Sequence, residues 1–310
     1  MTFDSAYHAP VLVTEVVELL RDRRRVLDCT LGGGGHSSAL LAANVENVVG
    51  VDRDPDALAA AGERLRGYAD AGRFEAVQSN YASIDEASAL DGVTFDGILI
   101  DLGISSHQID DTRRGFSFRP GAPLDMRMGT DAPADAADIL NAEDETTLTA
   151  IFRDFGDEPK AGRLAREIVR RRTNESFATS DDLVRAIRAV LGPRSGSADF
   201  ARLFQAIRIA VNDELPGLAR ALPILRERLT PGGRLVVISY HSGEDRLVKH
   251  AFREWSSNCV CPPKQPVCTC RGIALGETIT RRAMTASEEE IIRNPRARSA
   301  RLRAWQKSAT

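Results

Sequence analysis

The chain has 310 residues, of which 43% are hydrophobic and 27% charged. This composition supports a sizeable core and excludes a mainly disordered chain. No apolar run of about 18 residues occurs, so we expect no membrane span. The first ten residues have neither a basic start nor an apolar stretch. We therefore expect no secretory signal and a cytoplasmic location.

The net charge of −3 hides an asymmetry along the chain. Residues 1–150 carry 12 Lys and Arg against 26 Asp and Glu, whereas residues 151–310 carry 29 against 18. A basic half joined to an acidic half indicates a polyanionic partner for the basic half. Solvated helix faces are the alternative explanation.

The first hundred residues alternate short apolar runs with helical patterns. We expect strands at 25–31, 48–51, 74–78 and 95–102, and helices at 11–20, 36–43 and after the cap formed by Asp54 and Pro55. Strands alternating with helices predict βαβ units. The predicted fold class is therefore α/β, with a doubly wound, mostly parallel sheet of Rossmann-like type. Such a sheet binds ligands at the carboxyl ends of its strands.

The next strong strand, 233–239, comes about 130 residues after the fourth. A crossover needs only a few dozen residues. The surplus is helical in pattern at 160–172, at 181–190 and at Phe204, Ile207, Val211 and Leu215. We predict an inserted helical domain over 113–212 within a domain formed by 1–112 and 213–310. A helix over 244–255 and a final edge strand in the basic tail complete the expected fold.

Four consecutive glycines, Gly32 to Gly35, lie where the first strand turns into a helix. Glycine allows positive φ and a close approach to a ligand, and the start of a helix offers N–H groups. Asp52 ends the second strand, 20 residues beyond Gly32. A carboxylate at this place can accept hydrogen bonds from a ribose diol. The pattern indicates a nucleoside-containing ligand.

Three nucleotide sites compete for this loop. A P-loop is excluded because no Lys follows the glycines, and a NAD fingerprint is excluded because serine occupies its third glycine position. An adenosylmethionine site begins with an acid followed by glycines at alternate positions. Asp28, Thr30, Gly32 and Gly34 match that pattern with one substitution. A purely structural turn is the remaining alternative.

Rare sequence blocks occur along nearly the whole chain. They are HAPVL at 8–12, the glycine loop to His36, VDRDP at 51–55, DGILIDLGISS at 96–106, RGFSF at 114–118, PLDMRM at 123–128, FQAIR at 204–208, SYHS at 239–242 and NPRARS at 294–299. In these blocks the chain resembles the ribosomal RNA small-subunit methyltransferase H family.

The resemblance implies a class I methyltransferase sheet with an inserted substrate-recognition domain. It implies S-adenosylmethionine as methyl donor and N4-methylation of a cytidine in the decoding region of small-subunit (16S) ribosomal RNA. The implied partner is that RNA within the assembled small subunit, and a homodimer is compatible with the sequence. The resemblance implies donor contacts from Gly34, Gly35, His36, Asp52, Tyr81, Asp101 and Gln108. Tyr81 stands where the family often has Phe, and either ring can stack on adenine.

The exocyclic amine of cytosine is a weak nucleophile, so an acceptor near its N–H would assist the transfer. Asp101, at the end of the fourth strand, is the candidate catalytic residue. The resemblance instead suggests that Asp101 binds the amino group of the donor, and a helix cap is a structural alternative. Ser239 and His241 end the next strand and are candidates for lining the base pocket, although His241 is equally compatible with a hydrogen-bonded loop histidine. Phe116 and Phe118 either stack on the base or anchor a loop to the core.

Two clusters of basic residues fit the phosphate backbone of RNA. One is the helical run 160–172, and the other is the tail, where Arg296 and Arg298 lie in a family block and are the preferred RNA-binding candidates. A DNA amino-methyltransferase is an alternative function, disfavoured because no Pro-Pro-Tyr follows Asp101. A non-catalytic, RNA-binding assembly factor is another.

Of five cysteines, Cys29 lies in an apolar run and is expected to be buried. Cys259, Cys261, Cys268 and Cys270 form a Cys-x-Cys…Cys-x-Cys arrangement that can bind a structural Zn²⁺ through four thiolates. The spacing differs from the usual Cys-x₂-Cys, so reduced loop thiols are the alternative. Without a signal peptide, we do not expect disulfides.

Overall fold

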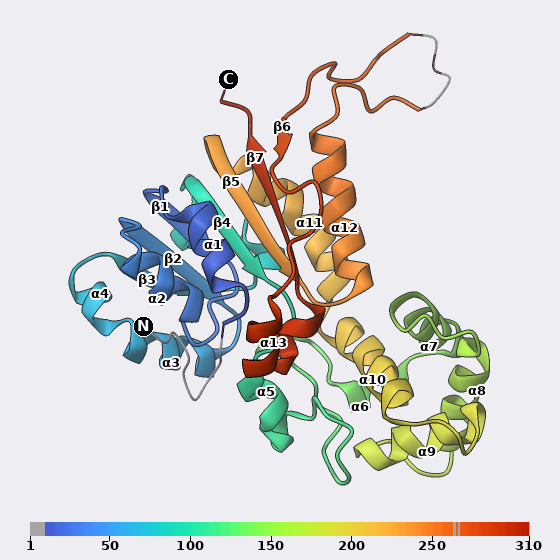
Figure 1. Ribbon diagram of the computed structural model, residues 1–310. Helices are drawn as coiled ribbons and strands as arrows, with labels where there is room; N and C mark the ends of the chain where they lie inside the picture. Colours follow the sequence, from blue (N-terminus) through green and yellow to red (C-terminus); the bar gives the residue numbers. More distant parts are fainter. Residues whose placement is uncertain (1–9, 263–264, 266, 310) are drawn as a thin grey trace. The chain divides into compact units, whose positions relative to one another are not determined.

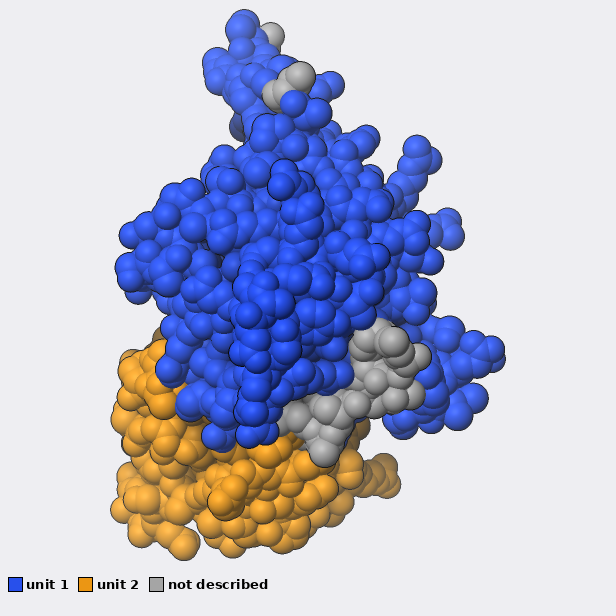
Figure 2. All heavy atoms as spheres, turned by 90° about the vertical axis from the view of Figure 1, so that its left-hand side faces the viewer, with its two compact units in different colours: residues 1–103, 215–310 blue, residues 104–214 orange. Residues whose placement is uncertain are grey.

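The structure is a computed structural model that describes residues 10–262, 265 and 267–309. His8 of the HAPVL block and the start of the N-terminal segment lie outside this range. The chain divides into two compact units, coloured separately in Figure 2. Unit 1 comprises residues 1–103 and 215–310, and unit 2 comprises residues 104–214. The predicted insertion, 113–212, falls within the range of unit 2.

Unit 1 is built on a seven-stranded sheet of order β3-β2-β1-β4-β5-β7-β6. Its strands are β1 (Arg25–Asp28), β2 (Asn47–Asp52), β3 (Phe74–Gln78), β4 (Phe95–Asp101), β5 (Leu229–Ser239), β6 (Gly276–Thr278) and β7 (Arg301–Lys307). Strands β1 to β5 pair in parallel, and β7 runs antiparallel between β5 and β6. The predicted mostly parallel α/β sheet is confirmed.

Helices cover both faces of this sheet (Figure 1). They are α1 (Val13–Leu20), α2 (Gly35–Ala42), α3 (Pro55–Arg64), α4 (Arg66–Asp70), α11 (Glu214–Glu227), α12 (Ser242–Trp255) and α13 (Glu288–Arg293), with short 3₁₀ turns η1 (Tyr81–Ser83), η2 (Ser88–Leu90) and η5 (Pro295–Ser299). Along β5, Leu235 and Val237 face the core shared with α11 and α12, whereas Val236 and Ile238 face the core shared with α1 and α2. This alternation is the expected pattern of a strand buried on both faces.

Several expected element boundaries were wrong. The tail strand β7 is not at the edge, because the three-residue strand β6 pairs with its outer side. Leu215 does not continue the helix of Phe204, because Asp213 has φ 53° and ends that helix, α10 (Ser197–Asn212), and Leu215 belongs to α11. The sequence reading also missed α11, whose interior contains Pro223. Proline is a strong helix breaker in sequence patterns, but burial of one helix face overrides it here.

Unit 2 is helical. Besides α10 it contains α5 (Ser106–Asp110), η3 (Thr112–Arg114), α6 (Ala136–Ala142), α7 (Glu145–Ala150), the π-helical turn η4 (Ile151–Phe155), α8 (Ala161–Arg172) and α9 (Ser180–Leu191). These helices enclose a core of their own. None of the helices in the described ranges is long and apolar enough to cross a membrane.

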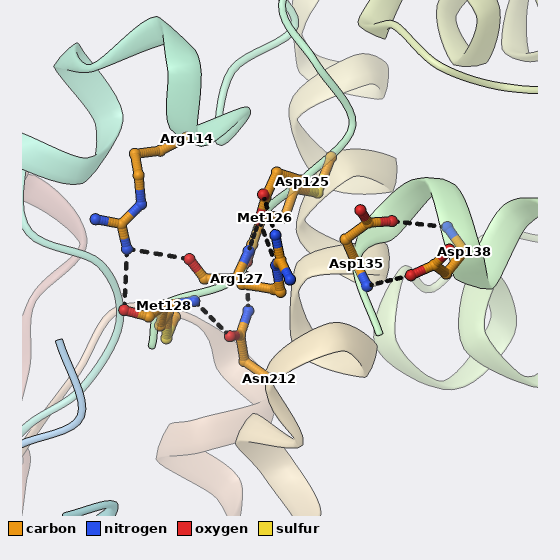
Figure 3. Close-up of polar contacts among 8 residues, drawn as sticks. All are labelled: Arg114, Asp125, Met126, Arg127, Met128, Asp135, Asp138 and Asn212. Atoms are coloured by element: carbon orange, nitrogen blue, oxygen red, sulfur yellow. Dashed lines mark hydrogen bonds and ion pairs between the residues drawn. The ribbon is translucent and has the colours of Figure 1, made fainter. Parts of the chain in front are cut away.

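The buried side-chain amide of Asn212 fixes the long loop of unit 2 between η3 and α6, residues 115–135 (Figure 3). The side chain of Asn212 accepts a hydrogen bond from the Met128 N–H at 2.8 Å and donates to the Met126 carbonyl at 2.7 Å. Arg114 donates to the Met128 carbonyl at 3.0 Å. These bonds hold Met126 at φ 62°, a left-handed conformation that non-glycine residues rarely adopt.

The aromatic pair of the RGFSF block anchors this loop. The Phe118 ring packs edge-on against Phe200 and Phe204, with centroids 5.9 and 6.1 Å apart. Phe116 packs against the same core. Of the two roles considered for these rings, the structure favours anchoring over stacking on a base.

A buried ion pair joins α12 to β7 within unit 1. Arg303 donates to both carboxylate oxygens of Asp245 at 2.7 and 3.1 Å, and each residue is only 8% exposed. We predict that Asp245→Ala lowers the free energy of unfolding by about 3 kcal/mol, because Arg303 is left buried without its partner. The matched control is Glu46→Ala, since the Arg24–Glu46 pair is 79% and 61% exposed and should change stability by less than about 1 kcal/mol. Equal losses in denaturant titrations would contradict this assignment.

Candidate functional site

Three acids lie at the carboxyl ends of neighbouring strands in unit 1. Asp28, Asp52 and Asp101 are the last residues of β1, β2 and β4. Because β1 lies between β2 and β4 with all three strands parallel, these ends meet at one edge of the sheet. This is the edge at which open α/β sheets bind ligands.

The glycine loop joins β1 to α2 at this edge. Gly34 has φ +73° and is the N-cap of α2, and a Cβ placed there would meet Leu65 Cδ1 at 3.0 Å. A Cβ on Gly35 would come within 2.9 Å of Pro10. A side chain at Gly34 would be strained by the positive φ, and one at Gly35 would require Pro10 to shift. Glycine at these places brings the backbone of the loop close to any ligand at the strand ends.

Asp52 ties the loop to the second strand. One carboxylate oxygen accepts the Gly32 N–H at 2.8 Å, and the other accepts the Asp54 N–H at 2.9 Å. Burial raises the pKa of Asp52 to about 6, although these two backbone bonds lower it. The carboxylate is thus largely desolvated and already oriented. The cap predicted for the next helix is confirmed, because Asp54 accepts from the Asp56 N–H.

Asp101 has a different set of partners. Its Oδ1 accepts a hydrogen bond from the Tyr240 hydroxyl at 2.9 Å, and its backbone N–H donates to Thr30 Oγ1 at 2.7 Å. Its Oδ2 lies 3.7 Å from His36 Nδ1. Burial raises the pKa of Asp101 to about 6, against the lowering effects of His36 and Tyr240. Asp101 ends a strand, so the suggestion that it caps a helix was wrong.

His36 is 5% exposed and is fixed by two contacts. Its Nε2 lies 2.8 Å from the Val11 carbonyl oxygen. Because a carbonyl can only accept, Nε2 must carry a hydrogen, which leaves Nδ1 facing Asp101. The Nδ1–Oδ2 distance of 3.7 Å is longer than a hydrogen bond, so this second contact is one of proximity.

Tyr240 is a site residue that the sequence reading did not select, although it lies in the SYHS block. In the β4–β5 pairing Asp101 is opposite Ile238, so Tyr240 follows β5 at the same edge. Burial and the neighbouring Asp101 raise the pKa of Tyr240 well above its ordinary value, so its hydroxyl remains a donor. Tyr240 can be placed beside Asp101 only from the pairing of β4 with β5, and the sequence alone does not give that strand order.

Tyr81 and Gln108, the remaining residues predicted to contact the methyl donor, lie in different surroundings. Tyr81 begins η1 after β3 and packs half-buried against the core of unit 1. Gln108 belongs to unit 2, where its Oε1 accepts the Ser105 N–H at 3.0 Å and its Nε2 donates to the Met128 carbonyl at 3.4 Å. The donor-binding roles of both residues stay predictions.

The predicted RNA contacts at the end of β5 have internal partners. Ser239 is 2% exposed, and its hydroxyl donates to the Arg301 carbonyl at 3.2 Å. His241 is the N-cap of α12, and its Nδ1 accepts the Gly243 N–H at 3.2 Å. His241 is thus a hydrogen-bonded cap in this structure, and the RNA-contacting role of both residues stays a prediction.

The arginines of the two basic clusters lie in different surroundings. In α8, Arg170 and Arg171 both pair with Glu167, and Arg172 donates to the Leu140 carbonyl. Arg296 and Arg298 lie exposed on η5. Exposed arginines can contact phosphate, and Arg170 of α8 is exposed as well.

The strand order, the loop after β1 and the acid at the end of β2 together define an α/β class I methyltransferase. The chain belongs to the MraW methylase family, whose model matches residues 5–308. The methyltransferase class expected from the sequence is thereby confirmed.

Individual relatives extend this similarity. A protein of Gemmatimonas aurantiaca named ribosomal RNA small subunit methyltransferase H is 66% identical over 96% of this chain and 95% of its own length. A protein of the same name from Heliobacterium modesticaldum is 46% identical over 97% of this chain and 98% of its own. Among solved structures, an rRNA methylase from Streptococcus thermophilus has a TM-score of 0.41 at 11% identity, over 96% of this chain and 93% of that one.

We predict that Gly34→Ala weakens binding of adenosylmethionine and lowers stability, because it adds a Cβ against Leu65 at a position with positive φ. The matched control is Gly72→Ala, with φ +69° and no atom within 4 Å of the added Cβ. Both variants should lose about 1 to 2 kcal/mol of stability from the left-handed backbone. Only Gly34→Ala should also lose ligand affinity in calorimetry, and unchanged affinity would contradict the placement of the ligand at this loop.

Proposed function

We propose that the protein transfers a methyl group from S-adenosylmethionine to the N4 amine of a cytidine in the decoding region of small-subunit ribosomal RNA. The observation that carries the proposal is the similarity to relatives named ribosomal RNA small subunit methyltransferase H, which are 66% and 46% identical over nearly the full length of the chain. The acids and the glycine loop at one sheet edge supply the chemical support. The assembled small subunit is the proposed substrate and the cytoplasm the proposed location.

The strand-end residues fit the proposed donor. Asp52 offers a preoriented carboxylate for a ribose diol, and the start of α2 offers the Gly35 N–H, whereas the Gly34 N–H already donates to the Leu31 carbonyl at 2.9 Å. Asp101 offers a carboxylate for the amino group, and Tyr81 a ring for adenine. The donor, when bound, supplies an electrophilic methyl group on its sulfonium.

For the acceptor, the chain must orient a weakly nucleophilic amine and dispose of one proton. Asp101 is held by the Tyr240 hydroxyl and by its backbone bond to Thr30, so its carboxylate has a fixed direction. In the proposal Asp101 mainly binds the amino group of adenosylmethionine, and the proton lost by the acceptor amine passes to solvent. Arg296 and Arg298 are proposed to hold RNA phosphates, with unit 2 as the substrate-recognition unit. A homodimer stays a prediction from the sequence.

The raised pKa values predict a pH dependence of donor binding. Asp52 and Asp101 each have a pKa of about 6, so their charge is present above this pH and lost as the pH falls through it. An affinity for the methyl donor that depends on one of these ionised carboxylates should fall about tenfold from pH 7 to pH 5. Asp52→Asn should bind weakly at neutral pH and show a shallower dependence in calorimetry. A pH-independent affinity in the unmodified protein would contradict the roles of both carboxylates.

The reaction itself is tested with labelled donor and small ribosomal subunits from cells that lack this protein. We expect N4-methylcytidine in the small-subunit RNA by nucleoside mass spectrometry, and its loss in Asp52→Ala. The matched control is Asp91→Ala, an exposed acid of unit 1, which should retain the activity. Label in DNA instead would indicate a DNA amino-methyltransferase. Tight subunit binding with no label would indicate an assembly factor, and either result would refute the proposal.

A further inference from the structure

The segment between α12 and β6 spans residues 256–275, and its described residues form no hydrophobic core. Figure 1 shows it as an orange loop that extends beyond the ends of these two elements. None of its described residues (256–262, 265 and 267–275) is buried. Three of its large apolar side chains are exposed: Val260 at 38%, Val267 at 69% and Ile273 at 66%. Burial of apolar surface therefore cannot hold this segment in a defined fold.

Hydrogen bonds close the base of the segment. The Leu275 N–H donates to the Trp255 carbonyl at 2.8 Å, and the Ala274 N–H donates to Asn258 Oδ1 at 3.1 Å. Arg271 donates to the Ser257 carbonyl at 3.2 Å. These bonds tie the two ends together next to unit 1. Beyond the base, the described residues make local bonds: Gln265 donates to the Val267 carbonyl at 2.9 Å and to Thr269 Oγ1 at 2.8 Å.

In that part, four sulfurs converge. Cys259 and Cys261 lie on the outgoing chain, Cys268 and Cys270 on the returning chain, and all four Sγ atoms lie within 4.8 Å of one another. Cys268 Sγ is 3.8 Å from the sulfurs of Cys259 and Cys261 and 3.4 Å from that of Cys270. Four thiolates around one Zn²⁺ at about 2.3 Å are about 3.8 Å apart. A disulfide requires about 2.05 Å.

Backbone donors also point at these sulfurs. The Val260 N–H donates to Cys270 Sγ at 3.3 Å. The backbone of Gly272 bonds to the same sulfur, and the backbone of Thr269 bonds to Cys261. Such N–H donors orient metal-bound thiolates and offset their charge. Among the described residues, these cysteines are the one group of three or more His, Cys, Asp or Glu side chains placed so that they could hold a metal ion.

We propose that Cys259, Cys261, Cys268 and Cys270 bind one Zn²⁺ through four thiolates and that this ion folds the segment. On binding, four S–H bonds break, four Zn–S bonds form and four protons pass to solvent, with no change of oxidation state. The sulfurs fill all four tetrahedral positions, so no position is left for water or substrate. The site is therefore structural rather than catalytic, and its binding energy supplies the stabilisation that the missing core cannot.

The first test is the metal content of the full chain, purified without chelator and under reducing conditions, by plasma mass spectrometry. We expect about one zinc per chain. Cys268 Sγ lies within 3.8 Å of the other three sulfurs, so the Cys268→Ser variant should lose most of the bound zinc. The matched control is Cys29→Ala, since Cys29 is buried in the core of unit 1, and it should retain the full amount.

The second test uses titration of the chelator-stripped chain with Co²⁺ and with Zn²⁺. Co²⁺ should give the intense visible bands of a tetrahedral thiolate site, and Zn²⁺ should abolish them at one equivalent. Bound zinc should also protect the four thiols from alkylation and the segment from proteolysis. Metal contents near zero with no tetrahedral Co²⁺ spectrum would overturn the proposal. So would an intact mass lower by the four hydrogens that two disulfides lose.

Discussion

Burial of carboxylates at the ends of parallel strands is the constraint on which the site depends. Asp52 and Asp101 are moved out of bulk water, and the resulting desolvation outweighs the hydrogen bonds that favour their charged forms, so both have a pKa of about 6. Asp28, 1% exposed, is shifted in the same direction. A ligand that presents hydroxyl or ammonium donors to these oxygens recovers part of this cost. The sheet edge is therefore electrostatically prepared for a ligand rich in donors.

The rest of unit 1 keeps these carboxylates in place. The glycine loop passes over Asp52 and donates to it, and the parallel register of β4 and β5 places Tyr240 beside Asp101. The buried pair of Asp245 with Arg303 fastens the helix that follows β5. These contacts link β2 to the loop after β1, β4 to the residue after β5, and α12 to β7. The orientation of the acids is consequently a property of the whole sheet rather than of one loop.

Local signals in the sequence were sufficient for part of this picture. The glycines, the acid ending β2 and the Asp54 cap are short-range patterns with a direct physical meaning. Tyr240 and Thr30 could not be assigned as partners of Asp101, because that requires knowing which strands are neighbours. The three-residue strand β6 carries too little pattern to be seen. The four cysteines were visible as a motif, but the convergence of their sulfurs depends on how the chain returns on itself.

The central claim is that ionised carboxylates at the strand ends bind adenosylmethionine. Calorimetric titrations near pH 6, repeated in buffers of different ionisation enthalpy, measure the protons exchanged on binding. Because Asp52 and Asp101 are partly protonated at that pH, their engagement predicts a net release of protons to the buffer, decreasing toward neutral pH. Binding without proton release near pH 6, or no binding at all, would contradict this role of the two carboxylates.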